Sequence, residues 1–186
     1  MEVAIMIVIE NGEFMDGMIG KNLGKYQIVE QLGEGGMATV YKAYDQALER
    51  FVAIKVIRTG SMADPLFLGR FEREAKALAK LDHPYILKVL DYGEQDGVPY
   101  LVMPFVGHGT LKQYTTDRLP WERAFAIIIP IAEALSYAHK RHIVHRDIKP
   151  ANILFGESGE PILSDFGIAK MLDAGEQTQL TGTGLG

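Results

Sequence analysis

The first half of the chain, from Tyr26 to Val102, carries short apolar runs separated by turn residues, which is typical of β-strands. The segments "YQIVEQL" and "ATVYKAY" flank the turn "GEGG" and predict a hairpin. The segment "FVAIKVI" (51–57) predicts a third strand, and "ILKVLDYG" and "PYLVMPF" predict two more around "EQDG". The pattern therefore predicts a small lobe with five strands.

One segment inside this lobe changes to helical spacing. Between Pro65 and Leu81, one residue in every three or four falls on a common face. The members of this face are Phe67, Phe71, Glu74, Leu78 and Leu81. A helix over 65–81 is therefore expected, with one carboxylate among its apolar residues.

The second half of the chain has the pattern of helices. Thr110 and Gln113 have the spacing of a capping box, which predicts the start of a short helix. A long helix is expected from Pro120 to Lys140, with Pro120 suited to its first turn. Pro130 lies inside this helix and is expected to kink it. We place the boundary between a strand-rich and a helical lobe near residue 107.

Composition limits the classes of function. The apolar and charged fractions, 47% and 23%, are those of an ordinary globular protein. A net charge of −5 argues against nucleic acid as a partner. The absence of cysteine excludes disulfides and thiolate metal sites, and it agrees with a reducing cytoplasm. The apolar run "VAIMIVI" (3–9) is too short to span a membrane, so we interpret residues 1–20 as a poorly ordered leader.

The segment "IVHRDIKPANILF" (143–155) concentrates polar groups between two apolar runs. Pro150 and the restricted residue before it exclude a helix interior, so this segment is expected to be a loop. Its polar side chains are His145, Arg146, Asp147, Lys149 and Asn152. Such a loop is either solvated surface or a set of functional groups that converge on one site.

The segment "LGEGGMATV" (32–40) is a glycine-rich turn between two predicted strands. Gly33, Gly35 and Gly36 would let backbone amides approach phosphate oxygens without obstruction by a Cβ atom. A plain hairpin would use glycines as well, and Ala38 occupies the place of the third glycine in G-x-G-x-x-G. The turn is not of the Rossmann type, because a strand follows it.

Three charged residues stand in otherwise apolar surroundings. Lys55 shares a strand face with Ala53, and Glu74 lies on the apolar face of its helix. An ion pair between Lys55 and Glu74 would explain why each charge lies in apolar surroundings, although either side chain could also reach solvent. Asp165, in "SDFGIAK", follows the strand "PIL" and is either a metal-binding carboxylate or a turn former.

The order of these motifs resembles that of the eukaryotic-type (Hanks-type) serine/threonine protein kinases of bacteria. The glycine-rich hairpin, the lysine strand, the helix with its inward glutamate, HRD and DFG occur in sequence over residues 26–186. The resemblance implies an α+β, bilobal fold: an antiparallel five-stranded N-lobe with one helix over 21–106, and a partial helical C-lobe over 107–186. It also implies that the sequence ends within the activation segment.

The resemblance assigns catalytic roles in the transfer of the ATP γ-phosphoryl group to a serine or threonine of a protein substrate. Asp147 would accept the hydroxyl proton, and Lys149 would lie near the γ-phosphate. Lys55, held by Glu74, would contact the α- and β-phosphates. Mg²⁺ would be held by Asn152 and Asp165. His145 is expected to be structural and to pack under Phe166.

Binding and regulatory positions follow from the same resemblance. The residues expected around ATP are Leu32, Gly33, Glu34, Gly35, Gly36, Val40, Ala53, Lys55, Met103, Phe105, Val106 and Leu154, with Met103 as the gatekeeper. Arg146 is expected to pair with a phosphate on the activation segment, for which Thr178, Thr181 and Thr183 are candidates. A membrane anchor would lie in a longer parent protein, and no span is expected here.

Two other functions stay open from the sequence. A non-catalytic nucleotide-binding or interaction module would keep the lobe without catalysis, but Lys55, Asp147 and Asp165 are all present. A small-molecule phosphotransferase with a related lobe would not be expected to carry Lys149 after "HRDI" together with DFG.

Overall fold

The computed structural model describes residues 17–58, 65–115 and 118–167. Its larger sheet has six strands in the order β1-β2-β3-β4-β6-β5, and every neighbouring pair is antiparallel. The strands are β1 (Asn22–Leu23), β2 (Tyr26–Glu34), β3 (Ala38–Asp45), β4 (Arg50–Ile57), β5 (Asp91–Gln95) and β6 (Val98–Pro104). The five predicted strands are present, and β1 is an addition of two residues.

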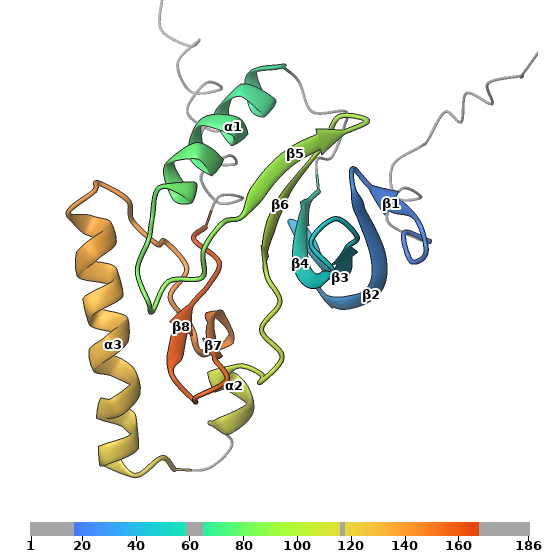
Figure 1. Cartoon of the computed structure of the whole chain (residues 1–186). Helices are drawn as coiled ribbons and strands as arrows, with labels where there is room; N and C mark the ends of the chain where they lie inside the picture. Colours follow the sequence, from blue (N-terminus) through green and yellow to red (C-terminus); the bar gives the residue numbers. More distant parts are fainter. Residues whose placement is uncertain (1–16, 59–64, 116–117, 168–186) are drawn as a thin grey trace, which may run out of the picture.

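The helical part of the chain follows the sheet. It contains α2 (Leu111–Tyr114), α3 (Trp121–His139), a 3₁₀ turn at Pro150–Asn152, and the small hairpin β7 (Ile153–Phe155) and β8 (Pro161–Leu163). Figure 1 shows α1 (Pro65–Ala79) alongside β5, and α3 on the side of the β7–β8 hairpin away from the sheet. The predicted α+β organisation, a sheet lobe with one helix and then a helical part, is confirmed.

Two boundaries differ from the sequence-based expectation. The run at 86–89 is not a strand: the amide of Leu87 donates to the carbonyl of Leu163, and the amide of Leu163 donates to the carbonyl of Tyr85, so this segment pairs with β8. Pairing with the sheet begins at Leu90, whose amide donates to the carbonyl of Val102 in β6. The predicted leader also reaches too far, because Met18 is buried and the Gly20 amide donates to Ile28. Residues 17–20 therefore belong to the folded lobe, and residues 1–16 lie outside the described part.

The two faces of the sheet are buried against different cores. The outer face packs in a cluster of its own, to which Met18 and Leu23 contribute from the N-terminal side and Tyr41, Ile54 and Val102 from the strands. Because side chains alternate along a strand, Val40, Ala53 and Lys55 point to the opposite face. We call the first the outer face and the second the cleft face.

The core on the cleft side joins both parts of the chain. Phe71 and Leu81, from α1 and its C-terminal end, belong to the same buried cluster as Ile127 and Ile131 of α3. Leu163 of β8 is fully buried in this cluster. The sheet and the helical part are therefore held together by apolar packing as well as by the connecting chain.

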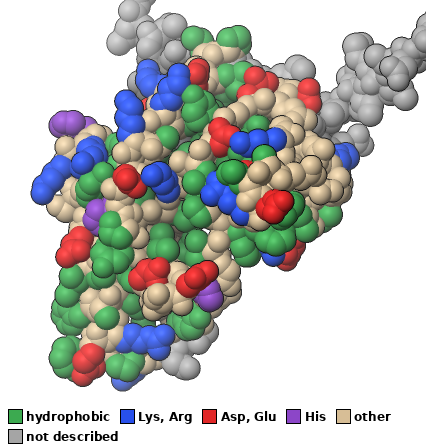
Figure 2. Space-filling model, viewed as in Figure 1, with side chains coloured by type: hydrophobic (Ala, Val, Ile, Leu, Met, Phe, Trp, Pro, Cys, Tyr) green, Lys and Arg blue, Asp and Glu red, His purple; other side chains and the backbone are tan. Residues whose placement is uncertain are grey.

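Helix α3 continues through Pro130. The proline removes one backbone donor, and the carbonyl left without it belongs to Ala126, an exposed residue that water can reach. Hydrophobic side chains also gather on the surface over α3, at the lower left of Figure 2. The exposed members are Trp121, Phe125, Ile128 and Ile129.

Candidate active site

His145 anchors the polar loop to the strand that precedes Asp165. Its imidazole is 1% exposed. Nε2–H donates to the carbonyl of Ser164 (2.8 Å), and Nδ1 accepts the amide of Asp147 (3.2 Å). Burial lowers the pKa of His145, in agreement with the neutral ring that these two bonds require. The ring centroid lies 4.6 Å from that of Phe166, which confirms the expected packing.

Asp147 is held by two neighbours from its own loop. The Asn152 amide nitrogen donates to the Asp147 backbone carbonyl (2.7 Å) and to its carboxylate Oδ2 (3.1 Å). Lys149 Nζ lies 2.7 Å from the same carboxylate oxygen. The 3₁₀ turn at Pro150–Asn152 brings the amide back to Asp147, and a proline is well suited to the first position of such a turn.

Asn152 is also tied to the segment that carries Asp165. The Ser164 amide (2.8 Å) and hydroxyl (3.1 Å) both donate to the Asn152 carbonyl. Sequence reasoning missed Ser164, although a polar residue directly after the apolar strand "PIL" was a usable signal. Through these bonds the loop of Asp147 and the strand end at Asp165 form one connected structure.

Lys55 pairs with Asp165 across the cleft face. The distance from Nζ to Oδ1 is 2.8 Å, and the two side chains are 13% and 32% exposed. The predicted Lys55–Glu74 pair is wrong for this structure, since the ammonium is taken by Asp165. Glu74 instead lies 3.8 Å from Arg73 and lines a small pocket with Arg146 and Phe166, where solvent still reaches it.

Two of the site residues have unusual backbone conformations. Arg146 and Asp165 have φ values of +64° and +59°. Residues other than glycine seldom occupy this left-handed region, and they do so at a cost of about 1–3 kcal/mol. The surrounding structure must therefore hold both residues in place, and such strain is typical of functional sites.

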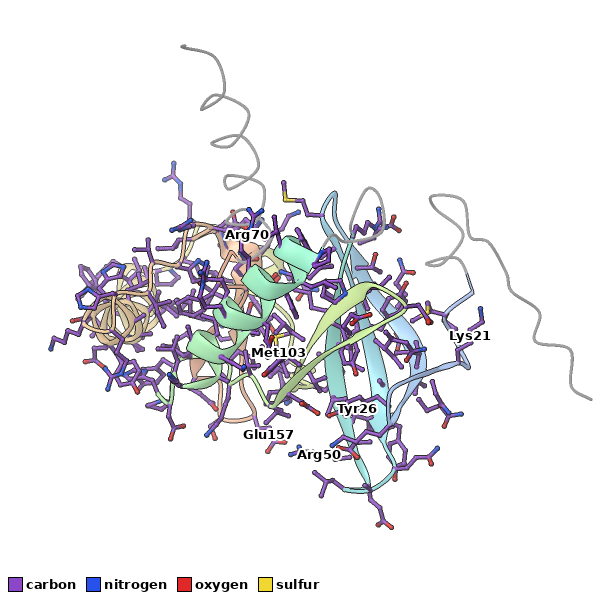
Figure 3. The ribbon with its side chains drawn as sticks, turned by 90° about the horizontal axis from the view of Figure 1, so that it is seen from above. Lys21, Tyr26, Arg50, Arg70, Met103 and Glu157 are labelled. Atoms are coloured by element: carbon purple, nitrogen blue, oxygen red, sulfur yellow. The ribbon has the colours of Figure 1, made fainter. Side chains whose placement is uncertain are left out.

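The sheet register brings the residues expected around the nucleotide into two rows, one through Lys55 and one through Ala53. Gly33 lies opposite Val40, Val40 opposite Lys55, and Ala53 opposite Met103. Figure 3 shows Met103 near the centre of the molecule, between the sheet and the helical part. Leu154, in β7, forms a β-bridge with Thr110, the residue before α2.

The segment after Met103 carries the last two residues of this set. Phe105 and Val106 are half-buried. The Lys42 ammonium lies 4.5 Å from the Phe105 ring centroid and 4.5 Å from that of Phe51. Lys42 therefore links the strands to the connecting segment by two cation–π contacts, which the sequence did not reveal.

The glycine-rich turn is a tight hairpin. The Gly35 amide donates to the Ala38 carbonyl at 2.8 Å. A Cβ atom at Gly33 or Gly36 would have nothing within 4 Å, so packing within the protein does not explain these glycines. Glu34, between them, forms an ion pair with Arg58, a residue that sequence reasoning also missed.

Comparison with known proteins decides the family. The model of the protein kinase domain matches residues 26–184. This chain belongs to the protein kinase family.

Similar proteins place it among bacterial serine/threonine kinases, as the motifs predicted. It is 46% identical over 160 residues to serine/threonine-protein kinase PrkC of Bacillus subtilis, covering 84% of this chain and 25% of that protein. It is 42% identical over 174 residues to PknF of Mycobacterium tuberculosis, covering 89% and 36%. The chain thus spans about a quarter to a third of the length of these curated relatives.

Solved structures agree with the predicted bilobal fold. The crystal structure of the PknI kinase domain of M. tuberculosis superposes with a TM-score of 0.72 at 36% identity, covering 84% of this chain and 66% of that one. Among the residues described here, no helix is long and apolar enough to cross a membrane. Thr178, Thr181 and Thr183 lie outside the described residues.

Proposed function

We propose that this chain is the ATP-binding part of a Mg²⁺-dependent serine/threonine protein kinase that acts in the cytoplasm. The observation that carries the proposal is the connected set of Lys55, Asp165, Asn152 and Asp147, which the contacts described above join through Ser164. Together with Lys149, which pairs with Asp147, this set has two cations and an amide around two carboxylates, an arrangement suited to holding a polyphosphate beside a reacting hydroxyl.

The donor set fits the implied metal. Asp165 offers a carboxylate and Asn152 an amide oxygen, and hard oxygen ligands of this kind, completed by phosphates and water, are what Mg²⁺ prefers. Bound there, the ion would neutralise charge on the phosphates. Among the described residues, no group of three His, Cys, Asp or Glu could hold a metal by itself, so the phosphates and water would have to supply the other ligands.

The remaining roles are proposed for side chains of the chain itself. Asp147 accepts the proton of the substrate hydroxyl while the hydroxyl oxygen bonds to the γ-phosphorus and the bond from the γ-phosphorus to ADP breaks. Lys149, paired with Asp147 at 2.7 Å, lies close enough to bind the transferred group's charge. Lys55 contacts the inner phosphates once it leaves Asp165.

Adenine would lie between Val40 and Ala53 of the sheet and Leu154 of β7, with backbone groups of Phe105 and Val106 at its edge. The glycine-rich turn would cover the phosphates. Arg146 is exposed and, by its position in the motif, is proposed to bind a phosphorylated threonine of the segment after Phe166.

The proposal is tested by thermal melting of the chain with and without Mg²⁺–ATP. At 100 times its Kd, a ligand stabilises a competent site by about 2.7 kcal/mol. We expect an increase in melting temperature that needs Mg²⁺ and that Asp165→Asn removes, each variant being compared with its own ligand-free melt. Transfer of ³²P from ATP to a generic protein substrate, with Asp147→Asn as the control, tests the catalytic step.

A melting shift without phosphoryl transfer would support a nucleotide-binding module instead of a kinase. A wild-type protein that melts cooperatively and shows no shift would contradict the proposed function.

A further inference from the structure

Arg58 lies directly behind the glycine-rich turn. It follows β4, in which Val52, Ile54 and Val56 point to the outer face. Because side chains alternate along a strand, Arg58 continues this outer series, while Lys55 points into the cleft. The guanidinium is thus on the side of the sheet away from the proposed nucleotide site.

From this position Arg58 contacts the turn and both of its flanking strands, β2 and β3. Its backbone amide donates to the Met37 carbonyl at 2.9 Å. Its Nε and Nη2 donate to the Thr39 hydroxyl of β3 at 3.3 and 3.0 Å. Nη2 also donates to the carboxylate of Glu34, the last residue of β2. One side chain therefore ties the two arms of the hairpin to the neighbouring strand.

The central member of this set is well buried. Thr39 is 1% exposed, whereas the side chains of Arg58 and Glu34 are 33% and 54% exposed. The hydrogen bond from Arg58 holds the pKa of Glu34 below its usual range, and Gln31 donates to the other carboxylate oxygen at 3.2 Å. Glu34 is therefore held as a carboxylate, pointing toward the outer face.

The charge of Glu34 needs this partner. An acidic residue lies in the turn that would cover three phosphates, where an unpaired carboxylate would repel the ligand. The Arg58 guanidinium cancels that charge and fixes its direction.

We propose that Arg58 is a positioning residue for nucleotide binding, which holds the glycine-rich turn from behind and neutralises Glu34. The inference rests on the proposed function, because it takes the ATP phosphates to bind under this turn. Arg58 would touch neither the ATP phosphates nor the substrate hydroxyl, and it acts through Glu34 and Thr39.

The first test measures the turn itself, without any nucleotide. Amide hydrogen exchange of residues 33–38 is compared in the wild-type chain, Arg58→Gln and Arg50→Gln. Arg50 is an exposed arginine at the opposite end of the same strand and serves as the matched control (Figure 3). We expect exchange to rise about two- to fivefold in Arg58→Gln only. Equal exchange in the two variants would overturn the structural half of the proposal.

The second test measures Mg²⁺–ATP affinity in Arg58→Gln, Arg58→Lys and the double variant Glu34→Gln/Arg58→Gln. We expect the Kd to rise about two- to fivefold in Arg58→Gln. The rise should be smaller in Arg58→Lys, because a lysine ammonium keeps the charge but replaces only some of the hydrogen bonds of the guanidinium. Removing the Glu34 charge as well should restore most of the affinity while exchange of the turn stays fast. A double variant that binds no better than Arg58→Gln would overturn the neutralisation.

The two proposals fail in different ways. A wild-type chain that binds no nucleotide contradicts the proposed function and leaves the exchange experiment to decide the role of Arg58. A wild-type chain that binds ATP, with Arg58→Gln matching Arg50→Gln in both measurements, contradicts the role of Arg58 alone.

Discussion

The Lys55–Asp165 ion pair makes a measurable prediction about stability in the absence of nucleotide. We consider Asp165→Asn, Lys55→Met and the double variant. Asp165→Asn leaves the Lys55 ammonium 13% exposed and without its counter-charge, because Glu74 is not in contact with it. Lys55→Met leaves Asp165, which is 32% exposed and can be hydrated in place.

The magnitude follows from the geometry. A hydrogen bond between charged groups contributes about 1.5–3 kcal/mol, and the partial exposure of Asp165 reduces this toward the lower end. We expect Asp165→Asn to lower the free energy of unfolding by about 2 kcal/mol and Lys55→Met by about 1 kcal/mol. The double variant should lose about 1 kcal/mol or less, because no charge is then left unpaired.

The assay is urea unfolding of the whole chain, followed by circular dichroism at pH 7. The matched control is the surface pair Lys76–Glu72, with a distance of 2.6 Å and side chains 57% and 53% exposed, for which a coupling of only about 0.3–0.5 kcal/mol is expected. If the effects of Lys55→Met and Asp165→Asn simply add in the double variant, the ion pair contributes nothing and the reasoning is refuted.

Three further predictions concern residues that support the site. Burial lowers the pKa of His145, so near neutral pH the folded state binds fewer protons than the unfolded state. The free energy of unfolding should therefore fall as pH drops below about 6.5, and this fall should be weaker in His145→Gln. Pro130→Ala restores a donor in α3 and should raise the free energy of unfolding by about 1–3 kcal/mol in urea titrations, whereas an unchanged value would mean that the helix has adapted to the proline. Leu81→Ala should cost about 2–5 kcal/mol by the same measurement and Leu81→Met less than about 1.5, and equal losses would argue against close packing at this residue.

Local pattern was sufficient for most elements of the fold. The apolar spacing between Phe67 and Leu78 placed α1, and alternation around Lys55 placed β4 with the correct residues on the cleft face. The same reasoning failed at Ile86, because an apolar run buried against β8 has the same pattern as a strand. The spacing of apolar residues indicates which residues are buried, but it does not indicate which element they pack against.

The site could be predicted as a list of residues but not as a set of contacts. Which cation meets which carboxylate depends on distances between segments far apart in sequence, so Lys55 was assigned to Glu74 while the structure pairs it with Asp165. The positive φ values of Arg146 and Asp165 likewise could not be read from the local sequence pattern. Arg58 was missed because an arginine after a strand has no local signal that distinguishes it from a solvated one.

The core that joins Phe71 and Leu81 to Ile127 and Ile131 also limits how the cleft can open. Two lobes connected only by a linker would open as rigid bodies about a hinge. Here such a swing would pull close-packed side chains away from each other, at the cost of burying less apolar surface. Opening is therefore expected to occur as a small sliding of α1 over the helical part, a shear in which packed residues exchange neighbours while staying buried.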